Sequence, residues 1–380
     1  MMKINKSLKI LFLILLVALA LRVYKLDDKE FGTDEEWTLE HTSQILEGSF
    51  FENAGTHAHP PLFYTIISPF WALSNHSIML LRSLMVLFSL ISISLVFFIG
   101  RKFFGENISL LAAALLAFSP FHLMYSQHLR SYIFIMSIAL IAIFVLYNFL
   151  KTASKKSLAL LTFLYICLFY LHTLTAFFVV SQFLIIGILL LAKKTKVKMK
   201  HVFISGVITI VGWLFWLPIF MQQFTHNITD GAIKTLTTLN PLHIPNVFYK
   251  YAVGVDVSSA SQVNSFFVFG LALILILLMF FGCFKLFQKS KLDFFIWCGS
   301  LFLPIIGLAI VGVFFPIFSF RYVSYLVPIF MLLVAKGFLS IPSKKTRSVL
   351  ILVTFIIWFL ILKFYWVSFV VVKWGHNFAL

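Results

Sequence analysis

Eleven long apolar runs leave few folds open to this chain. A segment needs about 20 apolar residues to cross about 30 Å of hydrocarbon, and runs near that length recur along the whole sequence. Because backbone polar groups in lipid must bond to one another, such runs fold as helices. Charged residues make up only 11% of the chain, against about 25% in an ordinary globular protein. We therefore expect an all-α integral membrane protein, a polytopic bundle with spans near 8–24, 80–100, 108–122, 132–150, 157–171, 173–192, 201–221, 264–284, 294–315, 322–340 and 348–369.

The net charge of +17 indicates topology rather than nucleic-acid binding. Nucleic-acid binding needs basic residues gathered on one soluble face, whereas here they lie between apolar runs, so we expect no nucleic-acid partner. If the N-terminus is cytoplasmic, 19 of the 30 basic residues fall on the cytoplasmic side. That asymmetry sets the orientation, because cytoplasmic loops carry an excess of lysine and arginine.

The acidic residues lie mostly on the opposite, outward side. Nine of the 13 fall between Asp27 and Glu52. Two outward segments, 25–79 and 222–263, are too long for simple turns, and long loops are usually functional or disordered. In the first, Thr33 and Glu36 form a capping box that predicts an interfacial helix from Asp34. We expect one domain over residues 1–380, with no separate C-terminal soluble domain.

Asp34 and Glu35 are the candidate catalytic residues. Acids in the first turn of a helix face unpaired N–H groups and the positive end of the dipole, which favour the ionised form that a base requires. Acids at such positions also commonly do no more than stabilise the helix. After them comes His59-Pro60-Pro61-Leu62-Phe63-Tyr64, whose prolines fix a bend. His59 either faces the pocket of Asp34 or is an inert interfacial histidine, and His57 competes for the role.

Arginines at the outer boundary are candidates for binding an anion. Arg130 follows Gln127 and His128 in a short outward turn, Arg321 enters a late span, and Arg82 begins the second span. A guanidinium fork matches phosphate oxygens, although an arginine there can also simply reach the interface. Together with the acidic loop, these residues predict an outward site for an anionic substrate, and they leave the reaction open.

The order of these motifs resembles the GT-C membrane glycosyltransferases, in the branch of protein O-mannosyltransferases and the aminoarabinose transferase of lipid A. The resemblance covers residues 10–150 and, more loosely, 316–340. The segments that carry it are Asp34-Glu35, His59 to Tyr64, Leu80 to Leu84, Gly100 to Gly105, Leu116 to Phe121, Tyr125 to Gln127, and Arg321-Tyr322.

The resemblance implies an inverting transfer from a polyprenyl-phosphate sugar to an acceptor hydroxyl on the outer side. Asp34 would be the general base, Glu35 would shape the site, and the acceptor would be a glycan, lipid or protein. No cofactor is expected and no metal is assigned, although Asp34, Glu35, His57, His59 and His128 could hold a divalent cation if they converge. The residues expected to bind substrate are His59, Tyr64, Arg82, Gln127, His128, Arg130, Tyr132, Arg321 and Tyr322.

One difference from the family pattern and two alternative functions stay open. His128 stands where the family carries an acid, so the acid is dispensable, His128 replaces part of it, or the activity is lost. A polymerase or ligase of lipid-linked glycans would also use outward arginines, and a transporter or flippase would handle the same lipids. Transporters carry polar residues at mid-membrane depth, which are nearly absent here. The composition suggests a bacterial plasma membrane.

Overall fold

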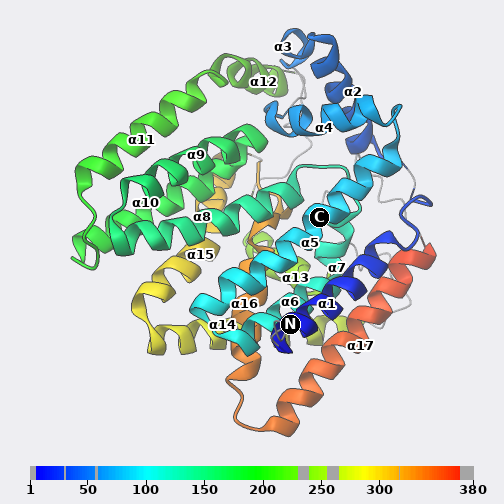
Figure 1. The fold of residues 1–380 in the computed structure, drawn as a ribbon, viewed down its shortest axis with the longest axis vertical. Helices are drawn as coiled ribbons and strands as arrows, with labels where there is room; N and C mark the ends of the chain where they lie inside the picture. The colour runs from blue at the N-terminus through cyan, green and yellow to red at the C-terminus, as the bar shows by residue number, and fades with distance from the viewer. Residues whose placement is uncertain are drawn as a thin grey trace, which may run out of the picture.

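The computed structural model describes residues 6–29, 31–55, 59–229, 239–254, 265–315 and 317–368, and every element within them is a helix. This confirms the all-α class (Figure 1). The elements are α1 Lys6–Val23, α2 Thr33–Glu47, α3 Phe50–Asn53, α4 Leu62–Leu73, α5 Ile78–Phe103, α6 Glu106–Phe118, α7 Pro120–Ser126, α8 Tyr132–Thr152, α9 Lys155–Leu171, η1 Thr173–Thr175, α10 Ala176–Leu191, α11 Met199–Leu214, α12 Leu217–Thr229, α13 His243–Val253, α14 Ser265–Lys289, α15 Lys291–Phe314, η3 Phe320–Leu326, α16 Val327–Leu339 and α17 Lys344–Ser368.

Seven helices of the described chain are long and apolar enough to cross a membrane, and nine if each of two bent helix pairs is one span. Each of the eleven predicted runs coincides with a helix or helix pair, but the count of eleven is not confirmed. Two of the helices at predicted runs, α9 and α1, do not meet the length and charge expected of a membrane span. α9 has only 17 residues, and the 18 residues of α1 include Lys6, Lys9 and Arg22.

Helices α2, α3, α4 and α12 gather at one end of the molecule, beyond the start of α5 (Figure 1). The helix predicted after the first span is present, but Gly32 rather than Thr33 is its N-cap, and no side chain caps it. The capping box was therefore wrong, because the helix starts one residue earlier. The buried face of α2 is polar, with Asp34, Glu35, Thr38, His41 and Thr42 at helical spacing. A polar face that is buried indicates a site rather than a helix that only rests on the membrane.

A break between α6 and α7 directs the chain toward that polar face. The two helices meet at 61°, at Pro120, whose missing N–H leaves the carbonyl of Leu116 without its helical donor. The buried guanidinium of Arg22 donates to the carbonyl oxygens of Leu116 and Ala117 at 3.5 and 2.9 Å, and to Nδ1 of His122 at 2.8 Å. Arg22 therefore stabilises the bend from which the loop 127–131 begins.

Helices α14 and α16 approach each other through two glycines. A Cβ atom on Gly282 of α14 would clash with the carbonyl oxygen of Leu333, and one on Gly337 of α16 would clash with that of Leu278. Small residues of this kind let two backbones come close in a membrane, where packing drives association. The close contact thus depends on both glycines.

We expect Gly282→Ala to destabilise the protein by about 1–3 kcal/mol, because the added methyl group overpacks the contact. Thermal unfolding in detergent measures the change. Gly270→Ala is the matched control, since Gly270 lies on the same helix with no atom near its Cβ position. Equal unfolding temperatures for the two variants would contradict the close packing.

Candidate active site

Asp34 lies between two arginines from distant parts of the chain. Its Oδ1 is 3.5 Å from Nη2 of Arg130, in the loop after α7, and its Oδ2 is 3.3 Å from Nη1 of Arg321, in η3. The Asp34 residue is only 4% exposed. The segments that the sequence analysis singled out thus meet around one carboxylate.

The two arginines hold the carboxyl of Asp34 in its ionised form. Burial would raise the pKa of Asp34, but Arg130, His128 and Arg321 together outweigh it and hold the pKa well below its usual range. Arg130 is fixed further by bonds from Nη1 to the Asp34 carbonyl at 3.2 Å and to Thr38 Oγ1 at 3.3 Å. Asp34 can therefore act as a proton acceptor only if the positive charge beside its carboxylate is reduced.

Glu35, one residue later, is fully enclosed and paired with Arg82. Nη2 of Arg82 lies 2.7 Å from Oε2 and Nε lies 3.3 Å from Oε1, a bidentate contact. The backbone N–H of Leu129 also donates to Oε1 at 3.0 Å. Burial would raise the pKa of Glu35, but Lys29, His128 and Arg82 lower it to about 2. Its oxygens are thus bound by Arg82 and Leu129, which gives Glu35 a positioning role, and a catalytic role for it stays a prediction.

Arg82 and Gln127, both expected to bind substrate, make hydrogen bonds within the chain. Nη1 of Arg82 donates to the carbonyls of Leu26 and Lys29 at 3.2 and 2.9 Å, in addition to the Glu35 contact. Nε2 of Gln127 donates to the carbonyl of Arg22 at 2.7 Å. The Tyr365 hydroxyl donates to Oε1 of Gln127 at 2.9 Å. These bonds hold both side chains within the chain, and their contact with substrate stays a prediction.

His128 stands directly beside Asp34. The Lys29 ammonium, a donor only, lies 3.2 Å from Nδ1 of His128, so a neutral ring carries its proton on Nε2. Nε2 is 4.0 Å from Oδ2 of Asp34. Burial and Lys29 lower the pKa of His128 below its usual value. Near neutral pH the residue is thus an uncharged imidazole whose N–H is directed toward the carboxylate.

His59 contacts Arg130 beside Asp34. Nη2 of Arg130 donates to Nε2 of His59 at 3.1 Å, and the His59 backbone N–H donates to the Tyr64 hydroxyl at 3.3 Å. Burial, the neighbouring His172 and Arg130 hold the pKa of His59 well below its usual range. His59 therefore orients Arg130, and Tyr64 orients His59.

Sequence reasoning missed His172, which lies between α9 and η1. The His172 ring centroid is 4.5 Å from that of His59, 5.3 Å from Tyr322 and 6.2 Å from Tyr132. Its Nδ1 accepts from the Leu174 N–H at 3.2 Å, so a neutral ring carries its proton on Nε2. Among the described residues this buried Nε2 has no hydrogen-bond partner. A lone histidine inside a long apolar stretch, at the expected outer boundary, was the available signal.

The four rings of His59, His172, Tyr132 and Tyr322 form one aromatic cluster beside the two arginines. Burial, Arg130 and Arg321 lower the pKa of His172 to about 3, which keeps it neutral.

No three His, Cys, Asp or Glu side chains in the described part of the chain are arranged to hold a metal ion. His57 lies outside the described residues.

We expect Glu35→Gln to destabilise the protein by about 3–5 kcal/mol at pH 7, because it leaves the buried Arg82 charge uncompensated. Thermal unfolding across pH measures this. The pKa of Glu35 is lowered on folding, so its stabilisation is present above the unfolded value of 4.5 and is lost as pH falls toward about 2. The difference in the free energy of unfolding between Glu35→Gln and wild type should therefore shrink as the pH falls.

The matched control is Glu36→Gln, since Glu36 lies in the same helical turn but is exposed. It should leave the free energy of unfolding within about 0.5 kcal/mol of wild type. Equal losses for the two variants would contradict the role assigned to Glu35.

Comparisons with known proteins bear on the fold of the chain. A family model described as dolichyl-phosphate-mannose-protein mannosyltransferase matches residues 58–218, less than half of the chain. A comparison with curated proteins finds no match. Among solved structures, ArnT from Cupriavidus metallidurans bound to undecaprenyl phosphate superposes with a TM-score of 0.59 at 12% identity, over 89% of this chain and 62% of ArnT.

Two further solved structures are similar. The Archaeoglobus fulgidus oligosaccharyltransferase in complex with Zn and sulfate gives a TM-score of 0.58 at 15% identity, over 93% of this chain and 53% of the other. AglB from the same organism, with an inhibitory peptide and a dolichol-phosphate, gives 0.55 at 12%, over 93% and 55%. The chain thus spans less than two thirds of the length of these proteins. The resemblance inferred from the motifs is confirmed, and the chain has the fold of the GT-C membrane glycosyltransferases.

Proposed function

We propose that this protein transfers a glycosyl unit from a polyprenyl-phosphate donor to an acceptor hydroxyl on the outer face of a bacterial plasma membrane, with the N-terminus in the cytoplasm. The observation that carries the proposal is the buried Asp34 carboxylate held between Arg130 and Arg321. Two similar structures contain undecaprenyl phosphate and dolichol-phosphate, which supports a lipid phosphate as the group that the arginines bind. The acceptor is a glycan, a lipid or a protein.

The reaction needs one proton acceptor and one anion site. The acceptor oxygen forms a bond to the anomeric carbon while the bond from that carbon to the phosphate oxygen breaks. The bonding pair leaves with the phosphate, whose charge Arg130 and Arg321 stabilise, and the acceptor proton passes to Asp34. A single displacement of this kind inverts the anomeric centre. The proposal includes no resident cofactor.

Donor binding would also activate the base. In the structure both arginines contact Asp34, which keeps its pKa far too low for an effective base. A bound phosphate would draw the guanidinium groups toward its own oxygens and weaken their hold on Asp34. Its negative charge would raise the pKa of Asp34 further. The base is therefore poised to gain basicity when the donor is present.

The aromatic cluster completes the donor side of the site. Tyr132 and Tyr322 come from α8 and η3, and their rings offer apolar faces with polar edges, as tyrosine does at membrane interfaces. The Nε2–H of His172 is directed among them without a partner in the described chain. A sugar or phosphate oxygen of the donor would satisfy it. His128, neutral beside Asp34, replaces the acid of the related family by a hydrogen-bond donor.

Asp34→Asn tests the central assignment. With purified protein in liposomes and synthetic polyprenyl-phosphate sugars as donors, we expect the transfer rate to fall at least about 100-fold, the loss expected when a general base is removed. Binding of undecaprenyl phosphate should persist or tighten, because the arginines lose their internal anion. Glu36→Gln should transfer at the wild-type rate. Transfer by Asp34→Asn at the wild-type rate would refute the role of the base, and no transfer by wild type with any donor would favour a transporter.

His172→Phe and His172→Gln test the aromatic cluster. Loss of one hydrogen bond to a charged group is worth about 1.5–3 kcal/mol, so we expect the KM for donor to rise about tenfold or more in the phenylalanine variant. Glutamine can place an N–H near the position of Nε2 and should restore part of the loss. Unchanged donor KM in both variants would show that the Nε2–H does not contact the donor.

A further inference from the structure

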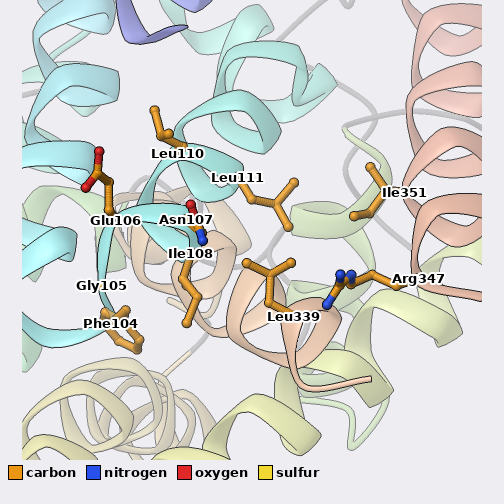
Figure 2. A pocket seen from close by; sticks show the side chains of 10 residues that line it. All are labelled: Phe104, Gly105, Glu106, Asn107, Ile108, Leu110, Leu111, Leu339, Arg347 and Ile351. Carbon is orange, nitrogen blue, oxygen red and sulfur yellow. The ribbon is translucent and has the colours of Figure 1, made fainter. Parts of the chain in front are cut away.

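A cavity of about 600 Å³ lies at the other end of α5 from Asp34. It is bordered by the start of α6, the end of α16 and the first turns of α17 (Figure 2). The 26 residues of α5 correspond to about 39 Å of helix. The cavity therefore lies toward the opposite membrane face from the candidate active site.

The walls of the cavity are mostly apolar and suit a hydrocarbon chain. Walls of this kind favour acyl chains, since water beside them would find few polar partners. The apolar side chains are Phe104, Ile108, Leu110, Leu111, Leu339 and Ile351.

Arg347 supplies a cation at one edge of this apolar space. Figure 2 shows its guanidinium directed from α17 into the cavity. Among the described residues its side chain has no hydrogen-bond or ion-pair partner, and it is half-buried. Glu106 also borders the cavity, but its carboxylate lies on the far side and points away from Arg347 (Figure 2). A half-buried guanidinium without a partner in the described chain is available to bind an anion.

The start of helix α17 adds positive charge near the cavity. The start of α6 does not, because its first turn carries Glu106. Helix α17 begins with Lys344, Lys345 and Arg347 and has no acid in its first turn. Cations at the positive end of a helix dipole are unfavourable, and an anion bound between them would relieve this.

We infer that this cavity binds one anionic phospholipid, with its phosphate against Arg347 and an acyl chain along the apolar wall. Charge complementarity selects this occupant, because basic pockets between transmembrane helices on the cytoplasmic side bind acidic headgroups. A zwitterionic lipid fits the apolar wall equally well, but its headgroup has no net charge to compensate Arg347.

Native mass spectrometry of the full-length protein, released from bilayers that contain equal amounts of phosphatidylglycerol and phosphatidylethanolamine with the same acyl chains, tests the inference. Wild type should retain one phosphatidylglycerol. Arg347→Ala should weaken retention about tenfold or more, as expected for one charge-assisted hydrogen bond. Leu111→Trp, which fills the cavity, should weaken it comparably without removing a charge.

Arg101→Ala is the matched control. Arg101 lies at the same end of α5, with its guanidinium 5.2 Å from the ring centroid of Phe98, and it does not line the cavity. It should retain the lipid as wild type does. Equal retention of both lipids by wild type, an unchanged affinity in Arg347→Ala, or an equal loss in Arg101→Ala would overturn the site, whatever the transfer assay shows.

Discussion

The ion pair between Glu35 and Arg82 is the contact on which the candidate site depends. Neither side chain meets water, and burying two charges is favourable only if their remaining hydrogen-bonding groups are satisfied. Here they are: the Leu129 N–H donates to Glu35, and the carbonyls of Leu26 and Lys29 accept from Arg82. The pair thereby joins α2, α5 and the loop after α7. This junction positions Asp34 and Arg130 beside each other, because Asp34 is the chain neighbour of Glu35 and Arg130 is the chain neighbour of Leu129.

A second buried cation, Arg22, likewise stabilises irregular backbone. Its guanidinium supplies donors to the carbonyls left open where Pro120 interrupts α6, and it reaches His122, whose Nε2 lies 2.8 Å from the Ser92 hydroxyl. The guanidinium groups of Arg22 and Arg82 thus bind backbone carbonyls at places where a regular helix ends. In lipid such groups cannot turn to water. Charged side chains therefore help to stabilise the broken backbone around the candidate site.

Hydropathy and residue type predicted much of this architecture. They do not predict which charged side chains pair with each other. Every predicted apolar run is helical, and Asp34, Arg130 and Arg321 converge although 287 positions separate the first and last. The sequence could not show that Arg82 is bound by Glu35 while Arg321 faces Asp34, because both arginines open a span at the same face. His172 was missed for a related reason. Its ring matters through neighbours on α8 and η3 that no spacing along the chain reveals.

The charge balance around Asp34 explains what a histidine at position 128 achieves. Four cations and two carboxylates meet there, so the cluster carries an excess of positive charge: Lys29, Arg82, Arg130 and Arg321 against Asp34 and Glu35. An acid at position 128 would cancel some of that excess and would compete with a substrate phosphate for the arginines. A neutral imidazole leaves the positive charge in place and still offers an N–H toward Asp34. In the proposed reaction, a histidine at position 128 would therefore favour tighter binding of the anionic donor. Since the departing lipid phosphate carries more negative charge than the donor, it would also favour slower release of the product.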